Sequence, residues 1–294
     1  MAPVGAGGAP AFATSTHAQY WLLTEPGIKA LREEVQNQCV KKGADPNDAS
    51  PTRQVSLQRG LIRRLMRICA DARVQAKVMF TACAYIRRFM LMALPTQYCL
   101  DPDVLLCALY VACKVDEQYL SAETVSSLRG GNESTLLGLE LEFMRLISFD
   151  LLVFDPFRPL AAFLDEEVVE DVDEGLSAKF LQDARQEGKR FLYSVIPTDV
   201  FTLESPGAVA LVALRAGLAA AVEASDVECL GADSLFLAIV RQATGLGDTA
   251  AQVLCKKVSG LQVRIQHAIH VASQSQAEDD AAAADILQAV TIIA

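Results

Sequence analysis

Two stretches of the sequence are apolar over lengths that suit a buried helix. Residues 74–92 are apolar on nearly every side, and residues 104–115 contain a single charge, that of Lys114. Buried strands are usually no longer than about eight residues, so both stretches are predicted to be core helices. Elsewhere apolar residues recur at helical spacing, and no alternating strand pattern is flanked by hairpin turns. The sequence therefore predicts an all-α protein.

Capping residues and periodicity predict further helices on both sides of these stretches. Thr24 is placed to cap a helix that runs to about Lys41, and Asp101 with Pro102 marks the start of the second core helix. Residues 42–52 contain two prolines, a glycine and an asparagine, and are predicted to be a loop. The other predicted helices are residues 57–68, a short helix capped by Ser121, and residues 134–148, 178–196, 205–222, 232–244, 248–272 and 285–294.

These elements form two successive groups of helices, which indicates two domains joined by a proline-containing linker. The predicted divisions are residues 1–52 (a disordered tail, an N-terminal helix and a loop), 53–151 (first domain), 152–159 (linker), 160–272 (second domain) and 273–294 (a C-terminal tail or short helix). The acidic run 165–174 is predicted to be a solvated loop. The polar, alanine-rich residues 274–284 are predicted to be part of the tail.

The charge and composition favour a globular protein with protein partners. Of the 294 residues, 52% are hydrophobic and 21% are charged, and the formal net charge is −10. No basic stripe that would neutralise nucleic-acid phosphates is visible. The longest apolar stretch, 208–222, is interrupted by Arg215 and is short for a membrane span. We therefore expect neither direct nucleic-acid binding nor membrane insertion.

The eight cysteines include no C-x-x-C pair. Five of them lie inside apolar helical stretches, where free cysteine behaves as a small hydrophobe, namely Cys69, Cys83, Cys107, Cys113 and Cys255. The first twenty residues lack a basic start followed by an apolar run, so no secretory signal is predicted. We therefore expect a reducing, intracellular compartment and no disulfide bonds.

No catalytic, cofactor-binding or metal-binding residue is predicted. Residues 165–171 are rich in carboxylates, but they would bind magnesium only if they faced a cavity. His267 and His270 are three residues apart, and no third ligand is near them in the sequence. The glycine-rich residues 4–8 follow no predicted strand, and the kinase motifs H-R-D and D-F-G are absent. The chain is therefore expected not to be an enzyme.

Lys114 and Glu140 are charged residues in apolar surroundings. Glu140 shares a predicted helix face with Leu136, Phe143 and Ile147, and a carboxylate on such a face is costly unless it is paired. Each residue is thus the natural partner of the other. Two structural explanations stay open, namely a lysine favoured by the dipole at a helix C-terminus and a glutamate that reaches solvent or an internal partner.

Five segments resemble motifs of one protein family. Residues 20–23 (Y-W-L-L) and 81–89 (T-A-C-A-Y-I-R-R-F) resemble the H-W-x-F entry and the T-A-x-x-Y-x-K-R-F run of transcriptional cyclins. Residues 111–117 (V-A-C-K-V-D-E) and 139–151 resemble the ends of the third and fifth helices of a cyclin box. Residues 155–160 (D-P-F-R-P-L) are similar to the linker N/H-P-Y-R-P-L. The chain thus resembles the cyclin family, with the H type the better match and the C type the next.

The resemblance implies two tandem five-helix cyclin folds, with N- and C-terminal helices packed on the first. It further implies a nuclear regulatory subunit that binds and activates a cyclin-dependent kinase of the activating type. The expected partners are that kinase, a RING-finger assembly factor and the TFIIH core, and the kinase substrates would be cell-cycle kinases and the RNA polymerase II tail. Two alternatives stay open: a Mediator-type cyclin similar to the C type, and a DNA-binding factor of the TFIIB type. The acidic charge and the lack of C-x-x-C argue against the TFIIB type.

By resemblance, Lys114 and Glu140 hold the main chain of the kinase beside its mobile αC helix. The same resemblance assigns kinase-facing positions to Val115, Met144, Phe149 and Leu151. Val115 is aliphatic where many cyclins have an aromatic residue, and core packing is an equal alternative for the other three. Trp21 is expected to anchor the N-terminal helix. Residues 61–67 lack the tryptophan-containing docking patch of mitotic cyclins, so recruitment of R-x-L substrates is not expected.

Overall fold

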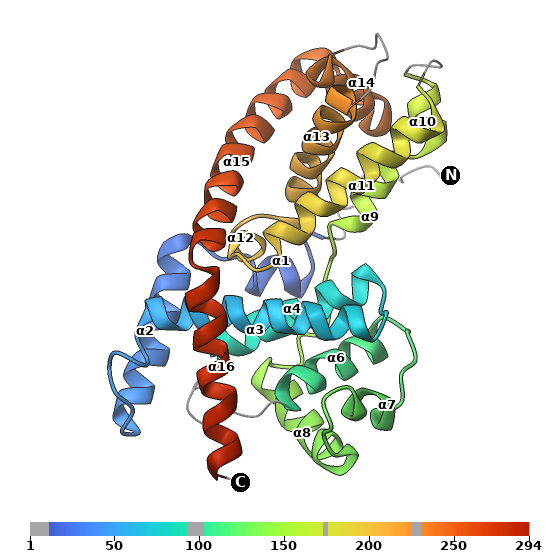
Figure 1. Ribbon diagram of the computed structural model, residues 1–294. Helices are drawn as coiled ribbons and strands as arrows, with labels where there is room; N and C mark the ends of the chain where they lie inside the picture. The colour runs from blue at the N-terminus through green and yellow to red at the C-terminus, as the bar shows by residue number, and fades with distance from the viewer. Residues whose placement is uncertain (1–11, 93–102, 173–175, 225–230, 294) are drawn as a thin grey trace. The chain divides into compact units, whose positions relative to one another are not determined.

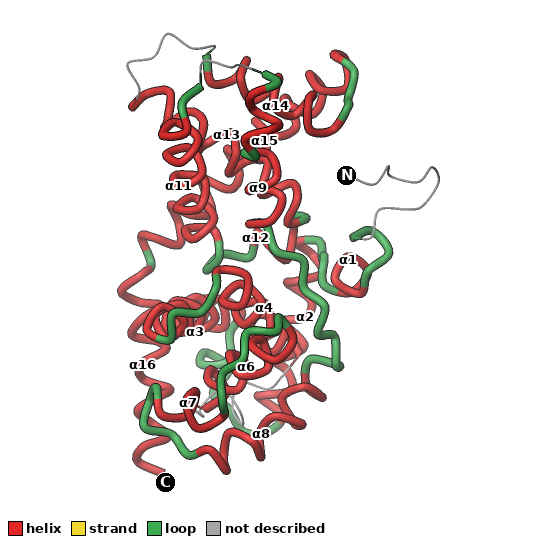
Figure 2. Tube along the Cα trace, turned by 90° about the vertical axis from the view of Figure 1, so that its right-hand side faces the viewer, coloured by secondary structure: helices red, strands yellow, loops and turns green. Residues whose placement is uncertain are grey.

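The computed structural model describes residues 12–92, 103–172, 176–224 and 231–293. These residues form fifteen helices and no strand, which confirms the all-α prediction (Figures 1 and 2). The chain divides into two compact units, one made of residues 1–154 and 277–294 and the other of residues 155–276. The first unit is therefore built from two separate segments of the chain.

The first unit surrounds one central helix, α4 (Ala76–Met92). Helices α2 (Glu25–Lys41), α3 (Pro51–Asp71), α6 (Asp103–Val115) and α8 (Glu133–Leu146) all pack against it. Every residue of α4 from 78 to 91 is buried, because apolar side chains occupy nearly every side of the helix. Both predicted core helices are confirmed.

Helix boundaries in the first unit agree with the predicted caps at most places. Thr24 caps α2, and Ser121 Oγ accepts a hydrogen bond from Thr124 N at 3.1 Å at the start of α7 (Ala122–Ser127). The predicted loop 42–52 is wrong at its end, because Ser50 caps α3 and the helix begins at Pro51. Asp101, Pro102, Cys99, Cys229 and the glycine-rich residues 4–8 lie outside the described residues.

The cysteines within the described residues are free. Cys39, Cys69, Cys83, Cys107 and Cys113 are buried, and Cys255 is half-buried. Burial raises the pKa of the Cys83 thiol to about 12 and that of Cys113 to about 11. These two thiols are therefore protonated and unreactive at neutral pH.

Trp21, the residue after α1 (Thr16–Tyr20), attaches the N-terminal segment to the rest of the first unit. Trp21 is buried, and its Nε1 donates a hydrogen bond to Asp150 Oδ2 at 3.0 Å. The guanidinium carbon of Arg88 lies 5.0 Å from the centre of the indole ring, within cation–π range. The predicted anchoring role of Trp21 is confirmed.

His17 of α1 is a second buried attachment point. Its Nδ1 accepts a hydrogen bond from Phe154 N at 3.0 Å, so the ring must be neutral at this nitrogen. Burial, followed by the charges of Arg88 and Arg87, lowers the pKa of His17 from 6.5 to about 3. The folded chain therefore resists protonation of this histidine.

We expect acid to weaken the attachment of α1. Because the pKa of His17 is lower in the folded chain, its contribution to stability is complete above pH 6.5 and is lost as the pH falls toward 3. At pH 5 the loss amounts to about 2 kcal/mol. Urea unfolding at pH 7 and pH 5 measures it. His17→Asn keeps a hydrogen-bond acceptor but does not titrate. Between pH 7 and pH 5 the free energy of unfolding of this variant should therefore fall less than that of the unsubstituted chain, by about 2 kcal/mol. An equal fall in both proteins would contradict the role given to His17.

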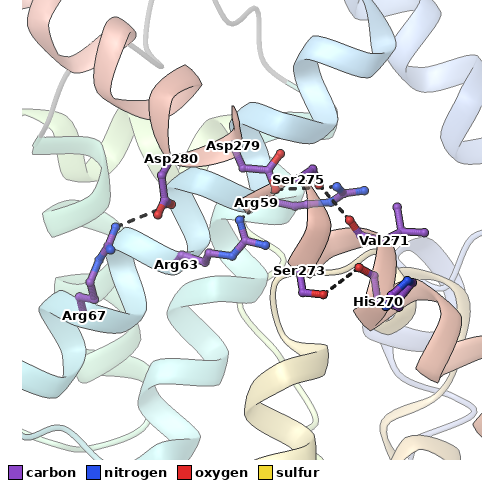
Figure 3. A network of polar contacts seen from close by, with 9 residues as sticks. All are labelled: Arg59, Arg63, Arg67, His270, Val271, Ser273, Ser275, Asp279 and Asp280. Carbon is purple, nitrogen blue, oxygen red and sulfur yellow. Dashed lines mark hydrogen bonds and ion pairs between the residues drawn. The ribbon is translucent and has the colours of Figure 1, made fainter. Parts of the chain in front are cut away.

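The C-terminal segment is a helix rather than the predicted polar tail over residues 274–284. Helix α16 (Gln276–Ile293) begins within that tail, and residues 277–294 belong to the first unit. Figure 3 shows Asp279 of α16 close to Arg63 of α3, with the carboxylate Oδ2 and guanidinium Nη1 2.9 Å apart. The helices approach closely at Gly60, where a Cβ atom would lie 2.2 Å from Asp279 O. The packing of a C-terminal helix on the first fold, implied by the resemblance, is confirmed.

The second unit surrounds α13 (Pro206–Ala224). Helices α9 (Phe157–Phe163), α11 (Ala178–Val195), α14 (Ala232–Thr244) and α15 (Asp248–Gln274) all contact α13. Helices α11 and α13 lie very close at Gly217, where a Cβ atom would be 2.3 Å from Ala184 O. The predicted helix 232–244 has the same bounds as α14.

Helix α13 is, by length and composition, apolar enough to cross a membrane, and at 19 residues it is longer than the predicted stretch 208–222. It is also the central helix of its unit. Arg215 Nε donates to Asp233 Oδ1 at 2.8 Å, and Arg215 Nη1 donates to Gln262 Oε1 at 2.6 Å. Its apolar side chains, including Val209, Val212 and Leu214, are buried, as in the core helix of a helical domain.

Two stretches of the second unit that were predicted to be irregular form short helices. Helix α9 begins inside the predicted linker, because Asp155 Oδ1 accepts hydrogen bonds from Phe157 N at 2.9 Å and Arg158 N at 3.0 Å. The acidic run contains α10 (Glu166–Glu170), which Asp165 caps, and carboxylates near a helix N-terminus are favoured by the dipole. The short helix α12 (Val200–Leu203) was not predicted.

Candidate partner-binding site

Lys114 and Glu140 form an ion pair between α6 and α8. Lys114 lies in the last turn of α6, and its Nζ donates a hydrogen bond to Glu140 Oε1. Leu136 and Phe143 on the same face of α8 are buried, and so is Ile147 directly after the helix, as the helical spacing predicts. The pairing inferred from the sequence is therefore confirmed.

The ion pair lies at the surface. The Lys114 side chain is 52% exposed and the Glu140 side chain 16% exposed. The hydrogen bond to Glu140 raises the pKa of Lys114, so the ammonium group stays charged at neutral pH. Lys114 Nζ also lies 5.2 Å from the centre of the Tyr110 ring. Solvent exposure leaves both charges available to a partner, which a fully buried pair would not be.

A cleft of about 590 Å³ opens beside Lys114. Its walls come from the end of α6, the segment that leads to α7 and the first half of α8, and they include Tyr110, Tyr119 and Leu137. Beyond Lys114 the chain turns at Glu117, whose φ is +59°. Lys77 Nζ pairs with Asp116 Oδ1 at 2.7 Å and holds this turn against α4. The turn after α6, which forms part of the cleft wall, is therefore held in place by the start of α4.

Exposed apolar side chains border the ion pair. Leu137 and Leu141 lie one helical turn apart on α8, on either side of Glu140 in the sequence, and Val115 follows Lys114 at the end of α6. All three are exposed. Large apolar side chains gathered around a charged group are typical of protein-binding surfaces.

The segment after α8, residues 148–152, is called the exit segment here. Ser148 and Phe149 both have left-handed backbone conformations, with φ of +59° and +55°. For residues other than glycine each such conformation costs about 1–3 kcal/mol. Phe149 is nevertheless 53% exposed and Leu152 50% exposed. Backbone strain in a segment that displays two apolar side chains is typical of a binding site rather than of a core.

The predicted kinase-facing residues occupy different environments. Val115 and Phe149 are exposed, whereas Met144 and Leu151 are half-buried. Phe149 N donates to Met144 O at 2.8 Å, which joins these two positions through the backbone. Leu151 contributes its carbonyl, which accepts a hydrogen bond from Tyr85. The binding role of all six predicted residues stays a prediction.

Sequence reasoning did not identify several residues of this surface, namely Tyr110, Tyr119, Leu137, Leu141 and Leu152. Leu137 and Leu141 could have been found, because they have the i, i+4 spacing of one helix face next to Glu140. Leu152 could not, because its exposure depends on the fold of the exit segment.

Residues 28–152 match the family described as the cyclin N-terminal domain. This range begins in α2, includes the five helices α3, α4, α6, α7 and α8, and contains the ion pair and the exit segment. This part of the chain is therefore similar to the cyclin N-terminal domain in both sequence and architecture.

Several proteins similar to this chain are cyclin-H proteins. A putative cyclin-H of Dictyostelium discoideum is 30% identical over 156 residues, which are 51% of this chain and 54% of that protein. Cyclin-H1-1 of Arabidopsis thaliana is 28% identical, over 52% of this chain and 45% of that protein. Cyclin-H of Xenopus laevis is 28% identical over 61% of this chain and 58% of that protein. The chain thus spans about half the length of the curated relatives it matches.

Two solved structures share the fold. A chain in the cryo-EM structure of the yeast TFIIK complex (Kin28/Ccl1/Tfb3) aligns with a TM-score of 0.65 at 15% identity, over 86% of this chain and 99% of that chain. A chain in the CAK complex of Chaetomium thermophilum bound to ATP-gamma-S aligns with a TM-score of 0.73 at 16% identity, over 95% of this chain and 86% of that chain.

Proposed function

We propose that this chain is the cyclin subunit of a CDK-activating kinase, a regulatory protein without catalytic activity of its own. The observation that carries the proposal is the surface ion pair of Lys114 and Glu140, bordered by exposed apolar side chains on α6 and α8. The similarity to cyclin-H proteins supports it. The shared fold with chains of the TFIIK and CAK complexes agrees with it.

The proposed mechanism is a population shift in the kinase. In a free kinase of this kind the αC helix is badly placed, so the β3 lysine does not pair with the αC glutamate and the ATP phosphates are misaligned. Lys114 can donate to a main-chain carbonyl beside αC, and Glu140 can accept from a main-chain N–H. Because α6 and α8 are packed helices, the surface is preorganised and selects the active αC position.

The proposal extends to the assembly in which this kinase works. A RING-finger assembly factor and the TFIIH core are the further partners, and the nucleus is the compartment. The substrates of the activated kinase are other cell-cycle kinases and the tail of RNA polymerase II. The support for this part is the resemblance to cyclins of the H type and the names of the similar complexes.

The experiment is a pull-down from native lysate, followed by reconstitution with the recombinant form of the kinase recovered. The purified chain alone is expected to transfer no phosphate and to bind no nucleotide. Added to the kinase, it should raise peptide phosphorylation at least about tenfold, which corresponds to about 1.4 kcal/mol of shift toward the active state. Recovery of no cyclin-dependent kinase, with tight sequence-specific binding to duplex DNA at physiological salt, would contradict the proposal and favour a TFIIB-type factor.

A further inference from the structure

Three consecutive backbone carbonyls of the exit segment accept hydrogen bonds from side chains of the central helix α4. Tyr85 Oη donates to Leu151 O at 2.6 Å. Arg88 bridges the carbonyls on either side, since its Nη1 donates to Asp150 O and its Nη2 donates to Leu152 O at 3.1 Å. The donors lie in the core, so the exit segment is held from its buried side.

Both donor residues are buried, and a buried guanidinium is costly unless its donors are satisfied. Burial lowers the pKa of Arg88 to about 10, so the group still carries its charge at neutral pH. The ring of Trp21 lies beside the guanidinium, and Trp21 Nε1 donates to the Asp150 carboxylate. Arg88 is thus a charged group placed in the core with the backbone of the exit segment as its acceptor.

The consequence of these contacts appears on the outer side of the segment. The backbone is fixed at residues 150–152, while the side chains of Phe149 and Leu152 are turned outward and are half-exposed. A mobile loop that carried the same two side chains would lose conformational freedom on binding a partner. Here the folding of the first unit has already ordered the segment.

We infer that Tyr85 and Arg88 are positioning residues, which hold the exit segment so that Phe149 and Leu152 form a preorganised apolar contact for the kinase. The inference rests on the proposed function and adds Leu152 to the binding surface. A purely structural role would not need two exposed apolar side chains in this segment, because polar residues at these positions would be better solvated.

The test is a double-mutant cycle of kinase affinity. Tyr85→Phe removes only the hydroxyl and leaves the ring in the core, so the chain should stay folded. We expect it to weaken binding of the recombinant kinase about three- to tenfold, and to speed amide hydrogen exchange in the exit segment. In the Phe149→Ala background, Tyr85→Phe should change the affinity less than about twofold, because the residue through which it acts is gone.

A matched control is Thr198→Val in the second unit, which removes another buried hydroxyl that donates to a backbone carbonyl, that of Val195 at 2.7 Å. It should lower the melting temperature to a similar extent without changing the kinase affinity. Equal losses from Tyr85→Phe in both backgrounds would overturn the inference, as would full affinity of Phe149→Ala. If the unsubstituted chain binds no cyclin-dependent kinase, the proposed function fails and the inference fails with it.

Discussion

Glu140→Leu is expected to abolish most of the kinase activation while the chain stays folded. The neighbours of Glu140 on the α8 face are already apolar, and leucine suits a helix. The substitution leaves Lys114 without its partner, but this side chain is exposed and can turn its ammonium toward solvent. Glu140 makes one of the two proposed charge-assisted hydrogen bonds to the kinase main chain and holds Lys114 for the other, so activation should fall at least about a hundredfold. Phosphorylation by the reconstituted complex and circular dichroism measure the two effects.

Lys114→Met should act in the same way, and the double variant should be little worse than either single variant. Such non-additivity is expected when two residues work as one unit. Arg264→Met is a matched control, because it removes a similarly exposed ion pair, that of Arg264 with Glu204 at 2.8 Å in the second unit. This variant should activate normally. Normal activation by both Lys114→Met and Glu140→Leu would show that the pair is structural only.

Asp279→Ala is expected to cause a large loss of stability, because it removes the buried carboxylate through which α16 contacts α3. The Asp279 side chain is fully buried, with Arg63 Nη1 at 2.9 Å and Arg59 Nη1 at 3.7 Å from its Oδ2 (Figure 3). Removal of the carboxylate takes this ion-pair partner away from two largely buried guanidinium groups, which costs about 3–5 kcal/mol. Helix α16 should then detach, and the melting temperature of the first unit should fall by on the order of 10 °C.

The neighbouring Asp280 provides the control for this prediction. Its side chain is 31% exposed, and its Oδ1 lies 3.9 Å from Nη2 of an exposed Arg67. Asp280→Ala should therefore change the free energy of unfolding by less than about 1 kcal/mol. Digestion with thermolysin reports the detachment, because α16 contains no lysine or arginine for trypsin. Equal sensitivity of the two variants would contradict the docking role of Asp279.

A large part of the candidate site could be predicted from the sequence. The pairing of Lys114 with Glu140 follows from one charge in each of two apolar patterns, and such charges need partners wherever the helices lie. The exposure of Phe149 could not be predicted in this way, because an aromatic residue after an apolar helix is equally suited to a core. Tyr85 and Arg88, more than sixty residues earlier in the chain, hold the backbone of the residues that follow Phe149, and the Phe149 side chain is exposed.

The sequence by itself determined most of the longer helices and many of their ends. Periodic apolar residues specify a buried face, and side chains such as those of Thr24 and Ser121 satisfy the first backbone N–H groups locally. Only the tertiary structure decided that the polar, alanine-rich C-terminal residues form a helix. They have no apolar periodicity, and their helix is stabilised by Arg63 and by the close approach at Gly60, more than two hundred residues away along the chain. Local patterns cannot report such contacts, because the free energy that stabilises them arises only when distant segments meet.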